Sequence, residues 1–315
     1  MDILEDEIIC KIIQNLKVKV RKKAISNKEQ ASLSAPKLIF VCGKEFLENE
    51  ETIRNYIIKT LKKYKVANHY GTQNELVLCI IAEKLYVQDL SEDIFSFEKM
   101  LAEISDRIII VAESPGTFCE LGAFVMDEQC RKKTTVINED NEAYKDSFIT
   151  KGPIKKLESL NEESIILHNG LSRIRSSHEY NYKVQRIAEA GLTININNNS
   201  NSVELKSLIY ELANIVELFQ PLEYFEIETL YKRFKEFKSY TIKNTANHKI
   251  RNIKQVLFLM EKMNILVKRE GYYIMNSNIS CYNVLFKISR KEFNDYRIAF
   301  LNRLNKCQKN RMDIL

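Results

Sequence analysis

Tryptophan is absent from the 315-residue chain, and so is any stretch of 18 or more consecutive apolar residues. The second absence predicts that no segment spans a membrane. The opening residues, MDILEDEIIC, are acidic and lack a small-residue cleavage site, so we expect no secretory signal. Apolar residues make up 45% of the chain and charged residues 29%, a balance typical of a soluble globular protein with a substantial core.

Histidine is scarce, with four residues, and the seven cysteines form no CxxC pair. Without a Cys/His cluster, we expect no zinc or other metal site. The odd number of scattered cysteines is typical of reduced thiols and predicts a cytoplasmic protein.

The charge is distributed unevenly along the chain. From residue 203 onward, 20 Lys and Arg face 12 Asp and Glu, whereas the preceding residues carry 28 and 30. A basic C-terminal part is compatible with nucleic acid as a partner, and equally with a solvated basic surface.

Apolar runs alternate with amphipathic stretches over the first two thirds of the chain. The runs predict strands, and the amphipathic periods predict helices between them. The stretch 75–86 is ambiguous, and its length favours a helix. This alternation predicts an α/β fold with a mainly parallel, Rossmann-like sheet and flanking helices. The predicted strands cover 37–42, 106–112, 132–138 and 163–169, and the other helices cover 3–24, 51–64, 89–105 and 117–131.

A polar, Asn-rich stretch over 193–202 marks a boundary between domains. Beyond it, two helical patterns precede two short β-like pieces around Glu270 and Gly271, the order found in a winged helix-turn-helix. We therefore predict an N-terminal helix and connector over 1–35, a catalytic domain over 36–195 and a winged-helix domain over 203–315.

The stretch AESPGTFCELGAF, residues 112–124, follows a predicted strand directly. Ligands of parallel sheets bind at the carboxyl ends of strands, so this loop and Gly43 should face one crevice. The unpaired N–H groups at the start of the following helix can hold a phosphate or a sugar hydroxyl, and Gly116 lets a ligand approach the backbone closely.

Glu120 has two interpretations. Thr117-x-x-Glu120 matches a capping box, in which the glutamate closes back on its own helix end. Alternatively, a carboxylate kept ionised by the helix dipole attacks an anomeric carbon, as in retaining glycoside chemistry.

The segment SFEKMLAEISDRIIIVAESPGTFCELGAF resembles the nucleoside 2-deoxyribosyltransferase-like family and, more closely, the effector proteins of bacterial retrons. The resemblance extends to IFVCG (39–43), CRKKTTVI (130–137) and DSFITKGPIKKL (146–157). It implies that Glu120 is the nucleophile and that Glu98, where the family has an acid, contacts the reacting nucleoside. Asp106 would order the loop of the substrate-binding site, and Glu113 would contact the sugar hydroxyls. Ser114, Gly116 and Thr117 would contact sugar or phosphate, and Gly43 would let the ligand pass over the first strand. The chain has CGKEF where the transferases have Gly-Pro and an aromatic residue, which changes base recognition.

The resemblance further implies an N-glycosidase that cleaves NAD or a related nucleotide as substrate, without a cofactor. Its partners would be the retron reverse transcriptase and the RNA–DNA hybrid, which hold a toxic effector inactive, and it would form a homo-oligomer or larger assembly. In the winged helix, six residues would contact phosphates: Lys243, Lys249, Arg251, Lys254, Lys268 and Arg269. Lys151 to Lys156 would bind phosphates or form a solvated loop.

Two other classes fit part of the pattern. A winged-helix DNA-binding regulator would sense a nucleotide without turnover. A phosphoribohydrolase would carry the same Gly-Thr-x-x-Glu, but with an additional glycine pair that ESPGT lacks.

Overall fold

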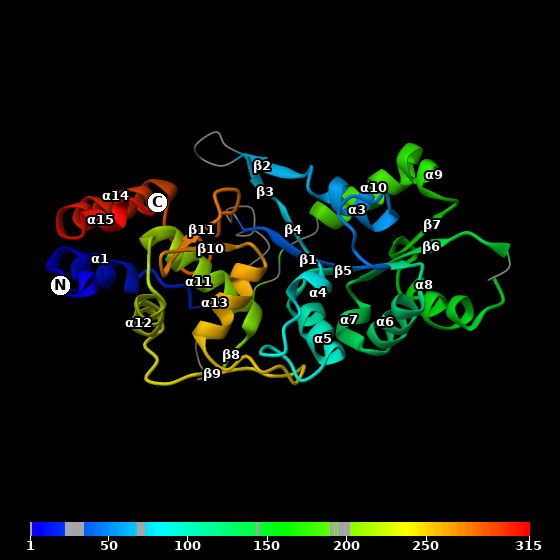
Figure 1. Cartoon of the computed structure of the whole chain (residues 1–315), viewed down its shortest axis with the longest axis horizontal. Coiled ribbons are helices and arrows are strands. Elements are labelled where there is room, and N and C mark those ends of the chain that lie inside the picture. Colours follow the sequence, from blue (N-terminus) through cyan, green and yellow to red (C-terminus); the bar gives the residue numbers. More distant parts are fainter. Residues whose placement is uncertain are drawn as a thin grey trace.

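A computed structural model describes residues 2–22, 35–67, 73–142, 145–189, 192, 194 and 202–315. It comprises an α/β part and a helical part, which lie side by side (Figure 1). The predicted boundary over 193–202 falls almost entirely outside the described residues, so it stays a prediction.

Five strands form one wholly parallel sheet in the order β4-β1-β5-β6-β7. The chain runs from β1 to β4 on one side and then returns to β5 on the other side of β1. The direction of winding therefore reverses between β1 and β5, which is where open parallel sheets bind ligands. The strands are β1 (Lys37–Cys42), β4 (Val77–Ile80), β5 (Arg107–Ala112), β6 (Thr134–Glu139) and β7 (Ile165–His168).

Both faces of the sheet are buried, because alternate residues of each strand point to opposite sides. In β1, Leu38 and Phe40 enter one core, whereas Ile39 and Val41 enter the other. The second core is completed by α3 (Ile53–Leu61), α9 (Leu171–Ser176) and α10 (His178–Glu189). The first is covered by α4 (Ala82–Leu85), α5 (Ile94–Ile104), α6 (Pro115–Met126), α7 (Glu128–Arg131) and α8 (Lys155–Glu158).

The predictions of the four parallel strands 37–42, 106–112, 132–138 and 163–169 are confirmed to within two residues at their ends. The helix predicted over 75–86 is wrong, because Val77–Ile80 pairs with β1 as a strand and only four residues of helix follow. A short apolar run is compatible with either a helix or a strand, and its pairing with a neighbouring strand decides between the two.

The segment that contains Lys151 to Lys156 is helical, so the predicted loop is wrong, whereas phosphate binding by these lysines stays a prediction. It forms a π-helix, η3 (Thr150–Ile154), that continues into α8. Lys151 pairs with Asp146 at 2.6 Å, and Phe148 packs over Gly152.

The helical part contains a long buried helix, α11, and a β-hairpin. The two strands of the hairpin, β10 and β11, are antiparallel and are joined at Glu270 and Gly271, both with positive φ. Its elements are β8 (Ser202–Val203), α11 (Leu205–Phe219), α12 (Tyr224–Lys235), β9 (Thr241–Ile242), α13 (Ile253–Lys262), β10 (Leu266–Arg269), β11 (Tyr272–Met275), α14 (Arg290–Cys307) and α15 (Lys309–Met312).

The N-terminal helix α1 (Glu7–Lys17), preceded by η1 (Ile3–Glu5), belongs to the helical part. It lies beside α12 and α14, near the C-terminus (Figure 1). Its N-cap Asp6 pairs with Arg303 of α14 at 2.6 Å, which fixes the two chain ends to each other.

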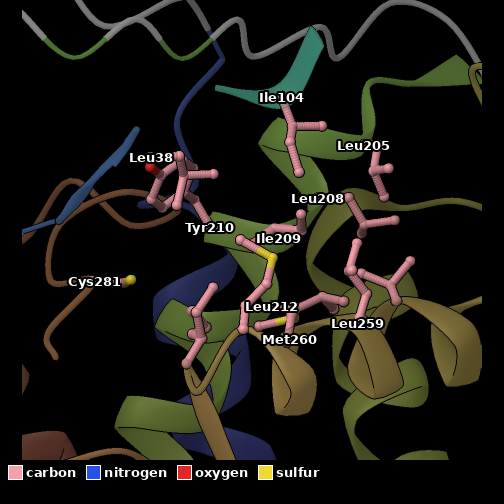
Figure 2. Close-up of a cluster of buried hydrophobic side chains, with 14 of the residues drawn as sticks. Leu38, Ile104, Leu205, Leu208, Ile209, Tyr210, Leu212, Leu259, Met260 and Cys281 are labelled. Atoms are coloured by element: carbon pink, nitrogen blue, oxygen red, sulfur yellow. The ribbon is translucent and has the colours of Figure 1, made fainter. Parts of the chain in front are cut away.

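One hydrophobic core continues from the sheet into the helical part. Leu38 and Ile104 of the α/β part gather with Leu208, Ile209 and Tyr210 of α11 (Figure 2). The Tyr210 hydroxyl also donates to the Pro36 carbonyl at 2.6 Å. Within the described ranges, no helix combines the length and the apolar character needed to cross a bilayer.

Candidate active site

The loops that follow β1 and β5 meet at the carboxyl edge of the sheet. The two strands are parallel neighbours, and the Lys44 backbone N–H donates to Glu113 Oε1 at 3.2 Å. The two loops therefore lie together at this edge, as predicted, whereas the crevice between them stays a prediction. Gly43, Glu113 and Ser114 all lie here.

Helix α6 begins earlier than predicted, with Ser114 as N-cap and Pro115 as its first residue. Its capping box is formed by Ser114 and Thr117, so the predicted Thr117–Glu120 capping box is wrong. Glu120 is the sixth residue of the helix rather than part of its first turn. Because the dipole acts within the first turn, it does not set the ionisation of Glu120.

Capping occupies two of the predicted substrate-binding side chains. Thr117 is buried, and its Oγ1 accepts from the N–H groups of Ser114 at 3.0 Å and Glu113 at 3.2 Å. Ser114 Oγ accepts from the Thr117 N–H at 3.3 Å. The buried Thr117 side chain therefore fixes the backbone conformation of the loop. Gly116 is exposed, and an added Cβ would meet only Ser114 Oγ, at 3.9 Å, so its backbone can be approached closely.

Glu120 is half-buried at this edge, and its Oε2 has no hydrogen-bond partner within the described part of the chain. Burial raises the pKa of its carboxyl, and the charge of Glu83 adds to the rise. A hydrogen bond from the Cys42 thiol and the Arg54 guanidinium act in the opposite direction. The pKa of Glu120 is raised overall, so Cys42 and Arg54 offset the effect of burial only in part, and the helix end does not contribute.

Glu98 of α5 belongs to the same cluster. Burial raises its pKa to about 7, with further contributions from the charges of Glu120 and Glu83, whereas Arg54 lowers it. Two interacting carboxyls with different surroundings are the usual arrangement of an acid/base pair. The structure therefore brings together the two residues predicted as catalytic.

Arg54 and Glu83 complete the cluster and were not predicted. Arg54 of α3 is 2% exposed, and its guanidinium donates to Glu83 at 2.6 and 2.9 Å. It also donates to the carbonyl oxygens of Val41 at 2.8 Å and Lys44 at 2.9 Å, at the end of β1. Arg54 therefore fixes the end of β1 and places a positive charge among the carboxylates of Glu83, Glu98 and Glu120.

Gly43 makes room for Arg54. An added Cβ would lie 2.6 Å from Arg54 Cδ, and this side chain is fixed by its ion pair with Glu83. The packing of Arg54 thus requires glycine at this position, and the role of Gly43 in letting a ligand pass over the strand stays a prediction.

Substitution Gly43→Ala is expected to displace Arg54 and to lower the free energy of unfolding by about 1–3 kcal/mol, as overpacking of a core does. Urea denaturation measures the change, with Gly116→Ala as the matched control because its added Cβ meets no atom closer than 3.9 Å. An unchanged unfolding midpoint for Gly43→Ala would show that Arg54 moves freely.

Asp106 lies at the opposite, amino end of β5. Its Oδ2 accepts from the Leu38 N–H at 2.9 Å, and its Oδ1 pairs with Lys206 of α11 at 2.6 Å. This carboxylate joins the sheet to the helical part, so its predicted role in substrate binding is not supported by its position.

The basic residues predicted to contact nucleic acid fall into two groups. Lys243 pairs with Glu204 at 3.8 Å, Lys249 pairs with Glu92 at 3.7 Å, and Arg251 donates to nearby carbonyl oxygens. The others are exposed on α13 and the hairpin: Lys254, Lys268 and Arg269. Lys243 and Arg251 are exposed as well, and Arg269 donates to the Ile314 carbonyl at 3.3 Å, so the two groups differ mainly in the carboxylate partners of Lys243 and Lys249.

Within the described residues, no group of three or more His, Cys, Asp and Glu side chains is arranged to hold a metal ion. Cavities of about 340 and 840 Å³ occur at the amino edge of the sheet, and neither is lined by Glu98 or Glu120. The carboxylate cluster is thus a half-buried site at the opposite edge.

These features define the class of protein: an α/β protein with an acidic cluster at the winding reversal of a parallel sheet, joined to a helical part with a β-hairpin. The chain belongs to the STM3845 retron effector protein family, whose family model matches residues 50–268. It is therefore a retron effector.

Two curated proteins of Escherichia coli are similar to this chain. It is 30% identical over 138 residues to "Retron Ec73 putative ribosyltransferase/DNA-binding protein", a match that covers 44% of this chain and 43% of that protein. It is 31% identical over 128 residues to "Retron Ec86 putative ribosyltransferase/DNA-binding protein", covering 41% and 39%. The chain thus spans less than half the length of the curated relatives it matches.

Proposed function

We propose that this retron effector cleaves the N-glycosidic bond of NAD or a related nucleotide, with Glu120 as nucleophile and Glu98 as the residue that activates water. The observation that carries the proposal is the coupled pair Glu98 and Glu120 at the β1/β5 winding reversal. The names of the two relatives, which include ribosyltransferase, support the same bond as the target.

In the first step, the Glu120 carboxylate forms a bond to the anomeric carbon while the bond to the base breaks. The electron pair of that bond leaves with the base. Nicotinamide in NAD is a cationic leaving group, so it departs neutral and needs no proton. In the second step, water attacks the glycosyl ester, and the water proton passes to the ionised Glu98. Free Glu120 and the ribosyl product result.

The roles follow from the surroundings of the two carboxyls. Arg54 and the Cys42 thiol both favour the ionised form of Glu120, which a nucleophile requires. Glu98, with a pKa of about 7, exchanges a proton readily near neutral pH. Incubation of the pure protein with NAD, ATP and deoxynucleosides, followed by chromatography of the released bases, tests the activity and identifies the substrate.

The rate of turnover is expected to rise with pH through about 7, because Glu98 must be ionised to accept a proton from water. Initial rates of base release from pH 5.5 to 8.5 measure this dependence. Glu98→Gln should lower the rate at pH 8 about 100- to 10,000-fold, the usual contribution of a general base. The same substitution should also abolish the increase of the rate with pH. A Glu98→Gln variant with the wild-type profile would contradict the assignment.

The partners in this proposal are the retron reverse transcriptase and its RNA–DNA hybrid. The order of α12, α13 and the β10–β11 hairpin is that of a winged helix, and the relatives' names include DNA-binding. Exposed Lys254, Lys268 and Arg269 would contact phosphates there, so hybrid binding should weaken as salt increases. If hybrid binding occurs but no nucleotide is cleaved, the chain is a nucleotide-sensing regulator without turnover.

A further inference from the structure

A cavity of about 340 Å³ lies at the amino edge of the sheet, away from the carboxylate cluster. Five basic side chains and one carboxylate line it: Arg107, Lys132, Lys133, Lys183, Arg186 and Glu163. Charged groups of one sign around a concave site concentrate ligands of the opposite sign. The cavity therefore favours a multiply charged anion.

The cations come from separate elements that meet at this edge. Arg107 opens β5, Lys132 and Lys133 precede β6, and Lys183 and Arg186 lie three residues apart on α10, hence on one helix face. The hydroxyl-bearing Thr134 and Thr135 line the same cavity and are buried. The arrangement is thus part of the packed α/β part and does not depend on a single surface helix.

Two of the cations are bonded to neutral oxygen atoms. Lys133 Nζ donates to the carbonyl oxygens of Glu103 at 3.0 Å and Ser105 at 2.8 Å, and Arg107 Nη1 donates to the Asp106 carbonyl at 3.2 Å. The single lining carboxylate, Glu163, lies 3.6 Å from Arg186. Two further lining cations pair with carboxylates that lie outside the lining: Lys132 with Glu128 at 2.6 Å and Lys183 with Glu179 at 2.8 Å. With these pairs counted, five cations still face three carboxylates, so positive charge exceeds negative charge around this cavity.

We propose that this cavity binds the phosphates of a free nucleoside di- or triphosphate, at a site separate from the proposed catalytic cluster. Phosphate matches the cations because guanidinium groups bind it through paired hydrogen bonds and ammonium groups bind it as point charges. The proposal does not depend on the proposed function, because none of its residues belongs to that cluster.

The adjoining cavity of about 840 Å³ has room for the remainder of the nucleotide. It shares Arg107, Lys132 and Lys133 with the smaller one. Its lining combines six Lys and Arg side chains with five carboxylates, and among them Lys99 pairs with Asp127 at 3.8 Å and Lys206 with Asp106 at 2.6 Å. The lining of the smaller cavity has five cations and one carboxylate. The phosphates therefore belong in the smaller cavity, and the sugar and base belong in the larger one.

The larger cavity is lined by both parts of the protein. Lys99 and Gln129 belong to the α/β part, whereas Lys206, Lys243 and His248 belong to the helical part. A nucleotide that extends into this cavity contacts both parts at once. Nucleotide binding at the amino edge of the sheet would thereby act on the helical part directly, without involving the proposed catalytic cluster.

Titration calorimetry of the full chain with ATP, ADP and inorganic phosphate tests the site. The Glu120→Gln background prevents turnover and should leave the binding unchanged. We expect ATP to bind more tightly than phosphate. The double substitution of Lys183 and Arg186 by Gln should weaken ATP binding about 100-fold or more, because each removes a charge-assisted contact.

The matched control is Lys59→Gln, which removes an exposed lysine of α3 and should leave ATP affinity unchanged. Thermal unfolding of each variant separates loss of binding from loss of fold, and Lys183→Arg with Arg186→Lys should retain affinity within about tenfold. Equal ATP affinity in the double Gln variant overturns the proposal and places the nucleotide elsewhere. A 12-nucleotide single strand that binds these residues while ATP does not would overturn it in favour of a nucleic-acid groove.

Discussion

Base release by the Glu120→Gln variant should fall about 10,000-fold or more, while the fold is preserved. An amide of the same size cannot attack the anomeric carbon, and loss of a covalent nucleophile removes most of the catalysis. The substitution should be tolerated structurally, because burial already raises the pKa of this carboxyl and one of its oxygens has no hydrogen-bond partner in the described structure. A neutral side chain therefore relieves a desolvation cost.

The measurement is chromatographic quantification of free base from the preferred substrate, together with the thermal unfolding midpoint. Glu128→Gln is the matched control, since Glu128 lies on α7 and pairs with exposed Lys132 at 2.6 Å, outside the cluster. The control should keep wild-type turnover. Normal base release by Glu120→Gln would remove the nucleophile from the proposed mechanism.

The positions of Glu98 and Glu120 could be predicted because each is placed by an element that the sequence shows clearly. Strand β5 is an apolar run, and both glutamates lie on helices that flank it. Parallel pairing of β1 with β5 then places both loops at one edge. Local patterns were sufficient to place the strands and helices, whereas the choice of Glu98 and Glu120 among their residues came from the family resemblance.

Arg54 and Glu83 could not be predicted in the same way. An arginine on an amphipathic helix is usually solvated, and nothing local shows that Arg54 reaches over Gly43 to the end of β1. The position of Glu83 depends on where β4 ends, and the sequence predicts a helix over that strand. Their ion pair is a tertiary contact between α3 and α4, the short helix that follows β4, so the periodicity of either segment does not predict it.

Two other errors had signals that were available. Ser114 followed by Pro115 is the pattern of an N-cap and first helical residue, and it would have placed Glu120 beyond the first turn. Helix α10 was not predicted, although Tyr180, Val184, Ile187 and Ala188 follow a helical period. The many polar residues of α10 make this helical period less evident in the sequence, because only one face of the helix is buried against the sheet.

Removal of the Arg54 guanidinium is the substitution with the second largest expected effect. Arg54→Met should lower the free energy of unfolding by about 2–4 kcal/mol, because it leaves the carbonyl oxygens of Val41 and Lys44 and the Glu83 carboxylate without their donor. The loss lies below that of a fully buried pair, because the Glu83 side chain is 42% exposed and can be rehydrated.

The same substitution should move the pH dependence of turnover upward. Arg54 lowers the pKa of both Glu98 and Glu120, so without it each carboxyl ionises at higher pH. Because Glu98 acts in its ionised form, the rise in rate should begin above pH 7. Urea denaturation and the rate profile from pH 5.5 to 9.5 measure the two effects separately.

A double-mutant cycle distinguishes a catalytic contribution of Arg54 from a structural one. Adding Glu83→Gln to Arg54→Met removes the unpaired carboxylate, so the double variant should regain part of the lost stability. It should regain only part of the pH shift, since Glu83 raises the pKa values of Glu98 and Glu120 but Arg54 lowers them. If the pH profile of Arg54→Met equals that of the wild type, the guanidinium does not tune the carboxylates and serves only to hold α3 against the end of β1.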